Sequence, residues 1–206
     1  MSGDTIFVPK MKGMAVLLLL TLPTGVRVGA EARPTLTVRL YNSSGVPRQE
    51  LQAARRALER TFEDTGLDLV FRQCGRSASA GDPVDSCSER LKALEVVVRV
   101  IDSPALNPTL HPEACGVAYL VRETDRGWLA TVFSNRIATV ATRTGVDAGT
   151  LLGLVTAHEI GHLLLGAGYH GWTGVMQADW PDAQIQDDRW QFSRVEAARM
   201  RDAARF

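Results

Sequence analysis

The sequence predicts an α+β fold: a twisted mixed sheet of about five strands, a backing helix, a buried central helix and a small C-terminal helical subdomain. Three observations predict it. A strand, a helix and a strand follow one another from residue 35, short apolar strands recur as far as residue 134, and a long apolar helix follows. A helix that is apolar nearly all round is buried. The chain of 206 residues is long enough for one well-buried domain.

The first predicted elements form a parallel unit. Residues 35–41 alternate apolar and polar side chains, as a half-buried strand does. A helix begins at Pro47, which suits a first helical turn, and runs to Gly66. Its apolar face is formed by Leu51, Ala54, Leu58 and Phe62. Residues 67–71 and 94–102 are the next strands, and a strand, a helix and a strand in this order favour a right-handed parallel connection.

The next elements are a hairpin and its preceding loop. The segment 103–113 is rich in proline and is predicted to be a loop with His111 at the surface, although His111 approaching the cleft is an alternative. Residues 116–121 and 128–134 are two strands joined by a charged turn at hairpin distance. Tyr119 in the first of these strands is expected to take part in ordinary packing.

Two helices complete the prediction. Asp147 is expected to cap the long central helix over residues 148–165. The segment 179–189 is predicted to be a polar loop. A last helix begins at Ser193 and runs to the end of the chain, where Ser193 and Glu196 form a capping box.

The central helix carries the motif His158-Glu159-Ile160-Gly161-His162. Residues four apart project from the same helical face, so the two imidazoles can share one metal ion. Glu159 lies about 100° further round the helix, where its carboxylate can reach a metal-bound water without being a ligand. Burial of these polar groups costs several kcal/mol unless something satisfies them, and a bound cation does so. The alternative is two core histidines bonded to the backbone and a glutamate that faces solvent.

A catalytic zinc site uses three protein ligands and leaves the fourth position to water, so a third donor must come from outside this pair. Gly166 and Gly168 can end the helix through a left-handed residue and turn the chain back under it. This turn brings His170 toward the metal, and we predict His170 as the third ligand. The acidic rivals for this position are Asp179, Asp182, Asp187, Asp188 and, disfavoured by its capping role, Glu196.

These residues resemble the metzincin zinc metallopeptidases, particularly their matrixin-like branch. The family pattern is H-E-x-x-H-x-x-G-x-x-H followed by a methionine in a tight turn, and Gly174-Val175-Met176 resembles that Met-turn. The spacing is expanded here. Gly166 lies eight residues after the first histidine and His170 lies twelve after it, whereas the family has seven and ten. The motif-bearing resemblance covers residues 147–177.

The resemblance implies an α/β-type zincin fold in which the central helix binds zinc. Residues 31–206 are then one catalytic domain, with an N-terminal subdomain over 31–166 and a C-terminal subdomain over 167–206. In the family, substrate lies along an edge strand of the sheet above the zinc helix. Residues 116–121 are the candidate edge strand in this sequence.

The chemistry expected of these parts is peptide-bond hydrolysis. Zinc lowers the pKa of its bound water toward about 7 and polarises the substrate carbonyl. Glu159 takes the proton as that water attacks and returns it to the leaving amine. One alternative is a zinc-binding domain of the same fold that is catalytically inactive or binds peptides. Another is a zinc hydrolase that acts on a non-peptide amide.

Residues 1–30 are typical of a secretory signal peptide. Two lysines precede the apolar run 14–22, and small residues at 28–30 or 30–32 offer a cleavage site. An uncleaved anchor is the less favoured alternative, because a membrane-spanning helix needs roughly 20 residues. We therefore expect a secreted or periplasmic protein that is not inserted stably in a membrane once the signal is cleaved.

The remaining chain is close to electrical neutrality. Without residues 1–30 it has 20 cationic and 22 anionic side chains. It has no basic stripe of the kind that follows a nucleic acid, so we expect no nucleic-acid partner. We expect a monomer whose partner is a protein or peptide substrate.

The expected export bears on the oxidation state of the three cysteines. A disulfide is expected outside the cytosol, and an odd count leaves one thiol over. Cys74 and Cys87 flank the polar loop 75–86 and are predicted to pair, which stabilises the fold by roughly 3 kcal/mol in the chain-entropy account. Cys115 is then expected to be a buried free thiol.

Overall fold

The structure is a computed structural model that describes residues 32–75, 87–103, 111, 113–186 and 190–205. The predicted signal segment 1–30 lies outside the described residues, as do the acids Asp187 and Asp188. From Ala32 onward the chain forms one compact unit.

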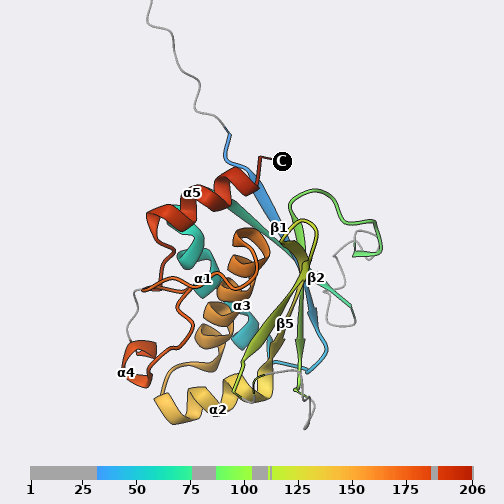
Figure 1. Ribbon diagram of the computed structural model, residues 1–206. Coiled ribbons are helices and arrows are strands. Elements are labelled where there is room, and N and C mark those ends of the chain that lie inside the picture. Colours follow the sequence, from blue (N-terminus) through green and yellow to red (C-terminus); the bar gives the residue numbers. More distant parts are fainter. Residues whose placement is uncertain (1–31, 76–86, 104–110, 112, 187–189, 206) are drawn as a thin grey trace, which may run out of the picture. The chain divides into compact units, whose positions relative to one another are not determined.

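The sheet has five strands in the order β2-β1-β3-β5-β4 (Figure 1). Their bounds are β1 Thr35–Asn42, β2 Asp68–Cys74, β3 Glu95–Ile101, β4 Gly116–Val121 and β5 Arg126–Phe133. The first three strands and β5 are parallel, and β4 pairs antiparallel with β5 at one edge of the sheet. This arrangement confirms the predicted mixed sheet and the parallel β1–β2 unit.

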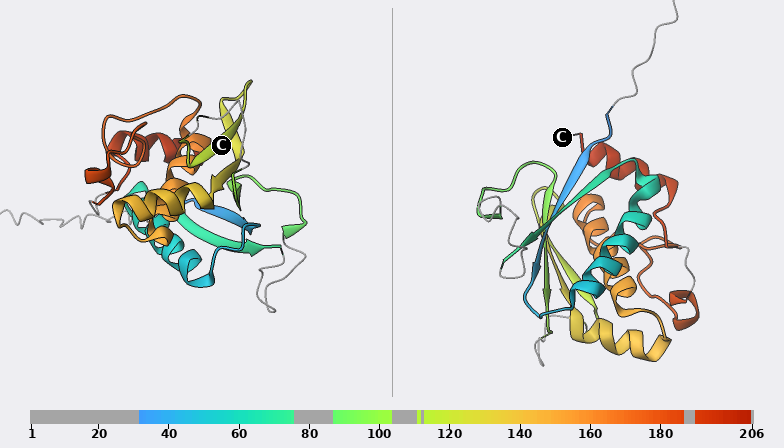
Figure 2. Two further views of the ribbon diagram at one scale, coloured as in Figure 1. Left: turned by 90° about the horizontal axis from the view of Figure 1, so that it is seen from below. Right: turned by 180° about the vertical axis from the view of Figure 1, so that it is seen from behind.

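Two long helices lie side by side on one face of the sheet, as both Figure 1 and Figure 2 show. Helix α1 is Arg48–Phe62, continued by the short turn η1 Glu63–Thr65, and helix α3 is Ala148–Leu165. Helix α3 is enclosed by α1 and the sheet, and 13 of its 18 residues are buried. This burial confirms the central helix of the predicted α+β fold.

The helix starts follow the predicted capping residues. The Asp147 carboxylate accepts the backbone N–H of Thr150 at 2.7 Å, which fixes the start of α3. The last helix, α5, is Arg194–Ala203, and Ser193 and Glu196 form the full capping box at its start. Both caps are confirmed, so α3, which carries the motif, and α5 begin where the sequence places them.

Two short helices were not predicted. Helix α2, Ser134–Thr144, follows β5 directly, and helix α4, Asp182–Ile185, interrupts the expected polar loop. Helix α2 is rich in β-branched residues, which have weak helix propensity. It is stabilised because Ile137 and Ala141 are buried, and because threonine hydroxyls along it donate to carbonyls four residues earlier. Tertiary packing has overridden local preference here.

Helix α3 is the one helix in the described part of the chain that is long and apolar enough to cross a membrane. Within the fold, however, 72% of it is buried. The apolar character of α3 is therefore that of a core helix packed between a sheet and a second helix.

The disulfide joins Cys74 at the end of β2 to Cys87, with 5.8 Å between their Cα atoms. Cys115 is a free thiol, but it is half-buried rather than buried as expected. The reason is its place just before the edge strand β4, where one side of the backbone has no neighbouring strand. The disulfide anchors residues 87–90 over the face of the sheet opposite the helices.

That segment covers a buried ion pair. Arg39 follows the core residue Val38 in β1. Successive side chains of a strand face opposite sides of the sheet, so the Arg39 side chain faces away from the helices. Its guanidinium pairs with the Glu95 carboxylate, and the two side chains are only 2% and 4% exposed. Arg39 also donates to the carbonyls of Cys87 and Glu89, at 3.3 and 2.7 Å. The two terminal nitrogens of the guanidinium are therefore bonded to groups from two segments, β3 and residues 87–90.

Replacing Glu95 by Gln is expected to lower the free energy of unfolding by about 3–5 kcal/mol, because it leaves the Arg39 charge buried without its counter-ion. Chemical denaturation measures the change. The matched control is Glu59→Gln, which breaks the exposed pair between Arg55 and Glu59 and should cost at most about 1 kcal/mol. Equal losses in the two variants would mean that the Arg39 pair contributes no more than a surface pair.

Candidate metal centre

Three imidazoles meet at the C-terminal half of α3. The ring nitrogens of His158, His162 and His170 that are available as ligands all lie within 4.8 Å of one another. Among the described residues, this is the one group of three or more metal-ligating side chains that could hold an ion. Two of the histidines come from the helix and the third comes from the turn that follows it. The cluster can therefore hold a metal ion with three nitrogen donors.

The orientation of His158 is fixed by a backbone carbonyl. Its Nδ1 lies 2.7 Å from the oxygen of Val175. A carbonyl only accepts, so Nδ1 carries the proton and Nε2 has a free lone pair. That Nε2 lies 3.0 Å from Nε2 of His162. A carbonyl that accepts from the far nitrogen is the usual support of a metal-binding histidine.

The two helical histidines are neutral at physiological pH. Burial lowers the pKa of His158 below its ordinary value. Burial, together with the neighbouring imidazoles His158 and His170, lowers the pKa of His162 to about 4. A neutral imidazole is the form that binds a metal, so at pH 7 protons compete weakly for these two side chains.

Glu159, one residue after His158, packs against the edge strand. Its side chain is buried, with the residue 6% exposed, so the alternative in which it faces solvent is wrong. A Cβ at Gly116 in β4 would lie 2.6 Å from Glu159 Oε1, so only glycine fits there without displacing the carboxylate. No donor among the described residues bonds to this carboxylate. Burial raises the pKa of Glu159 to about 8.

The raised pKa predicts how the metal-free protein responds to pH. A carboxyl whose pKa is 4.5 unfolded and about 8 folded contributes stability that is lost as pH rises toward 8. Above pH 6.5 the folded helical histidines are neutral, whereas unfolded histidines with a pKa of 6.5 still lose protons there. This loss raises the stability slightly with pH, so the effect of Glu159 is obtained by comparison with a variant that lacks its carboxyl. Relative to that variant, the unfolding free energy should fall by about 2 kcal/mol between pH 6.5 and 8. Denaturant titrations at each pH measure it.

The matched variant for this experiment is Glu159→Gln. It retains the size of the side chain but does not titrate, so its unfolding free energy should not fall over the same pH range. An equal slope in both proteins would show that the pH response comes from another group.

The predicted Met-turn packs directly under the helix. Met176 is fully buried, and a Cβ at Gly161 would lie 2.2 Å from its sulfur. Gly161 stands between Glu159 and His162, so the methionine supports the helix at the motif itself. Since the Val175 carbonyl also accepts from His158, this turn orients His158 and supports the helix at Gly161.

The described acidic rivals for the third ligand position all lie outside the histidine cluster. Asp182 begins α4 and pairs with Arg143 at 2.9 Å. Glu196 is used in the capping box with Ser193. Asp179 is exposed and does not join the cluster. The structure therefore brings a histidine, and no described acid, to the two helical ligands.

The fourth histidine and the edge strand lie as predicted, whereas Tyr119 does not. His111 is exposed at the surface, where it accepts the backbone N–H of Glu113 at 3.4 Å. Strand β4 is the edge strand expected from residues 116–121. Tyr119 was expected to be packed and is 46% exposed, because an edge strand leaves part of its surface uncovered.

Sequence reasoning assigned no role to the tryptophans near the site. The indole of Trp180 meets the His158 ring edge-on, with 5.7 Å between centroids, and donates to the Gln177 carbonyl at 3.1 Å. Trp172, two residues after His170, is 97% exposed. A tryptophan in an otherwise polar segment was the available signal for both.

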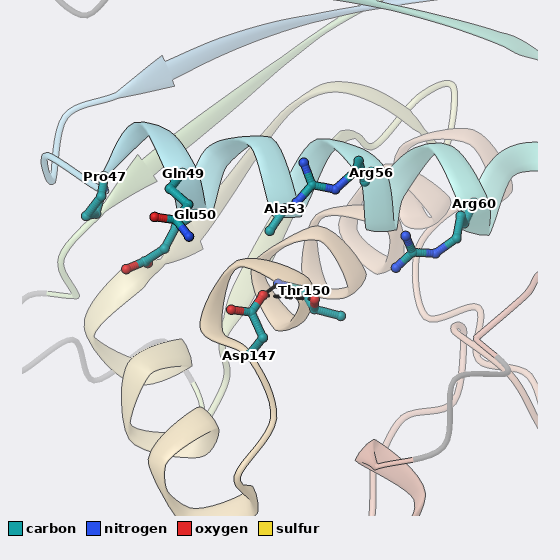
Figure 3. A pocket seen from close by; sticks show the side chains of 8 residues that line it. All are labelled: Pro47, Gln49, Glu50, Ala53, Arg56, Arg60, Asp147 and Thr150. Atoms are coloured by element: carbon teal, nitrogen blue, oxygen red, sulfur yellow. Dashed lines mark hydrogen bonds between the residues drawn. The ribbon is translucent and has the colours of Figure 1, made fainter.

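A separate hollow lies between α1 and the start of α3 (Figure 3), with a volume of about 520 Å³. It contains none of the three histidines. The carboxylate of Asp147 at its wall is already occupied by the backbone of Thr150. Its other lining residues are Pro47, Gln49, Glu50, Ala53, Arg56 and Arg60. The hollow offers no converging catalytic groups, so we place the functional site at the histidine cluster.

No family model and no curated protein sequence matches this chain. Among solved structures, it is similar to archaemetzincin from Methanopyrus kandleri, with a TM-score of 0.53, 17% identity, and coverage of 84% of this chain and 97% of that one. It is also similar to metalloproteinase-II from Bacteroides fragilis, with a TM-score of 0.48, 15% identity, and coverage of 85% of this chain and 55% of that one. The archaemetzincin likeness shows that this chain shares the fold of that protein. The matrixin-like branch stays a prediction.

Proposed function

We propose that this protein is an exported zinc-dependent endopeptidase. The observation that carries the proposal is the convergence of three imidazoles, two of them from the helix that also carries the buried carboxylate of Glu159. Three histidines with an open fourth position are a donor set of catalytic zinc sites, whereas a structural zinc site is closed by four protein ligands. The fold of the chain agrees with this function.

Each residue of the site has a proposed role. His158, His162 and His170 would hold zinc. Bound zinc would lower the pKa of a coordinated water and polarise the scissile carbonyl. Glu159 is the general base: its carboxylate accepts the proton of the attacking water and then donates it to the leaving amine. A cation nearby favours the ionised carboxylate, which opposes the effect of burial on the pKa of Glu159.

Substrate would bind along β4. The outer edge of this strand pairs with no other described strand, so its N–H and C=O groups are available to an extended peptide. Gly116 in β4 contacts the Glu159 side chain, which places the catalytic carboxylate next to that edge. A peptide added to the sheet would therefore run past the catalytic centre.

Two features support export. The segment 1–30 has the composition of a signal peptide, and Cys74 and Cys87 form a disulfide. Structural disulfides belong to oxidising compartments. A secreted or periplasmic location accounts for both.

The experiment that tests the proposal is digestion of an unstructured protein by the purified chain, with and without a metal chelator. We expect cleavage that stops on chelation and returns when one equivalent of zinc is added. Zinc binding without cleavage would instead support an inactive or peptide-binding domain. Cleavage confined to small non-peptide amides would support the other hydrolase class, and failure to bind zinc would overturn the histidine site.

A further inference from the structure

His170 is the least supported of the three candidate ligands. It lies on the turn after α3 and is exposed, whereas the other two are held by the helix. Among the described residues no hydrogen bond reaches its ring, which contacts the rings of His158 and His162 at centroid distances of 5.7 and 5.0 Å. The position of His170 must therefore come from the backbone on either side of it.

The residue before His170 is held by the C-terminal helix. The guanidinium of Arg199 in α5 lies 4.7 Å from the centre of the Tyr169 ring, which is a cation–π arrangement. The same guanidinium donates to the carbonyl of Leu165, at 3.3 Å. One side chain of α5 thus ties the last turn of α3 to the residue that precedes the ligand.

The residue after His170 is held by the same helix and by the Met-turn. A Cβ at Gly171 would lie 2.6 Å from Glu196 Oε1, so the backbone packs directly on that carboxylate. The N–H of Gly171 donates to the carbonyl of Met176 at 2.8 Å. Glu196 is itself fixed, since it is 1% exposed and is bonded to Ser193 in the capping box.

We propose that Arg199 and Glu196 are positioning residues for His170, so that the zinc affinity of the site depends on a helix that supplies no ligand. The inference rests on the proposed zinc site. It also gives a reason for the expanded spacing between His162 and His170: the longer turn needs support that α3 alone does not provide. Mutating a residue that orients a metal ligand in this way typically lowers the metal affinity by about 10–100-fold.

The test is the zinc dissociation constant, measured by competition with a chromophoric chelator. Arg199→Met is expected to weaken zinc binding about 10–100-fold. The matched control is Arg201→Met, in the same helix, because Arg201 also donates to a backbone carbonyl, that of Thr65, at 2.7 Å. Arg201 does not touch the His170 turn, so its variant should bind zinc as the unchanged protein does, even if it is less stable.

A double-mutant cycle tests the route of the effect. If Arg199 acts through the aromatic ring, Tyr169→Leu should weaken zinc binding to a similar extent, and the double variant should be no weaker than the weaker single one. The visible spectrum of the cobalt-substituted protein should change in both single variants, since it reports the donor set. If Arg199→Met does not fold, Arg199→Lys replaces it, because lysine keeps the charge but loses the planar group that stacks.

The outcomes separate the two proposals. If the unchanged protein binds no zinc, the proposed function fails. If it binds zinc and the Arg199 variant binds equally well with the same cobalt spectrum, the zinc site stands and only the positioning role of α5 is overturned. A loss shared equally by the Arg199 and Arg201 variants would mean general destabilisation and would also overturn it.

Discussion

Replacing Glu159 by Gln is expected to reduce peptide cleavage by about 10²–10⁴-fold, the usual contribution of a general base, while zinc stays bound. Glutamine has the size of glutamate, so its packing against Gly116 is kept, but its amide does not accept the proton. The carboxylate is not among the three donors that converge on the metal position. The measurements are kcat/KM on one peptide and zinc content, both on the same sample.

The matched control for that variant is Glu59→Gln, which alters an exposed acid of α1. It should cleave at the unchanged rate. A Glu159→Gln protein that retains full activity would remove Glu159 from the mechanism, and one that loses its zinc would make it a ligand instead of a base.

Replacing His162 by Ala is expected to lower zinc affinity by more than about 100-fold, because losing an outer partner of a ligand already costs 10–100-fold. Cleavage should be lost with the metal. The Nε2 of His162 lies 3.0 Å from Nε2 of His158. No other described side chain belongs to the cluster, so none is expected to replace it. Zinc retained after dialysis is the quantity to measure.

His111→Ala is the natural control, since this histidine is exposed and lies outside the cluster. Its zinc content should equal that of the unchanged protein. One tightly bound zinc in the His162→Ala protein would place the metal elsewhere in the chain.

The central helix and its motif could be predicted because both depend on local geometry. Residues four apart on a helix share a face whatever surrounds them, and Asp147 caps the helix through a contact three residues away. The apolar pattern gave the same span, 148–165, that the structure shows. His170 followed from the glycines that turn the chain back after this helix.

The support of the site could not be predicted, because it consists of contacts between distant segments. Nothing in the motif indicates that the Val175 carbonyl accepts from His158, or that Gly116 makes room for Glu159. The same holds for Arg199, which reaches back to Leu165 across 34 residues of chain. Each of these contacts exists only once the sheet and α5 have packed on α3.

The failure to predict helix α2 and the wrong prediction that Cys115 is buried have similar causes. Helix α2 forms from β-branched residues with weak intrinsic preference because packing stabilises it. Cys115 is half-buried because the strand that follows it lies at the edge of the sheet, which only the strand order determines. In both cases the deciding interaction is tertiary.

The most direct test of the three-histidine zinc site is anomalous X-ray scattering from a crystal of the zinc-loaded protein. We expect one zinc ion at about 2.0–2.1 Å from a ring nitrogen of each of His158, His162 and His170, with the fourth position open to water. A zinc ion bound without His170, or one closed off by a fourth protein ligand, would contradict a three-histidine catalytic site.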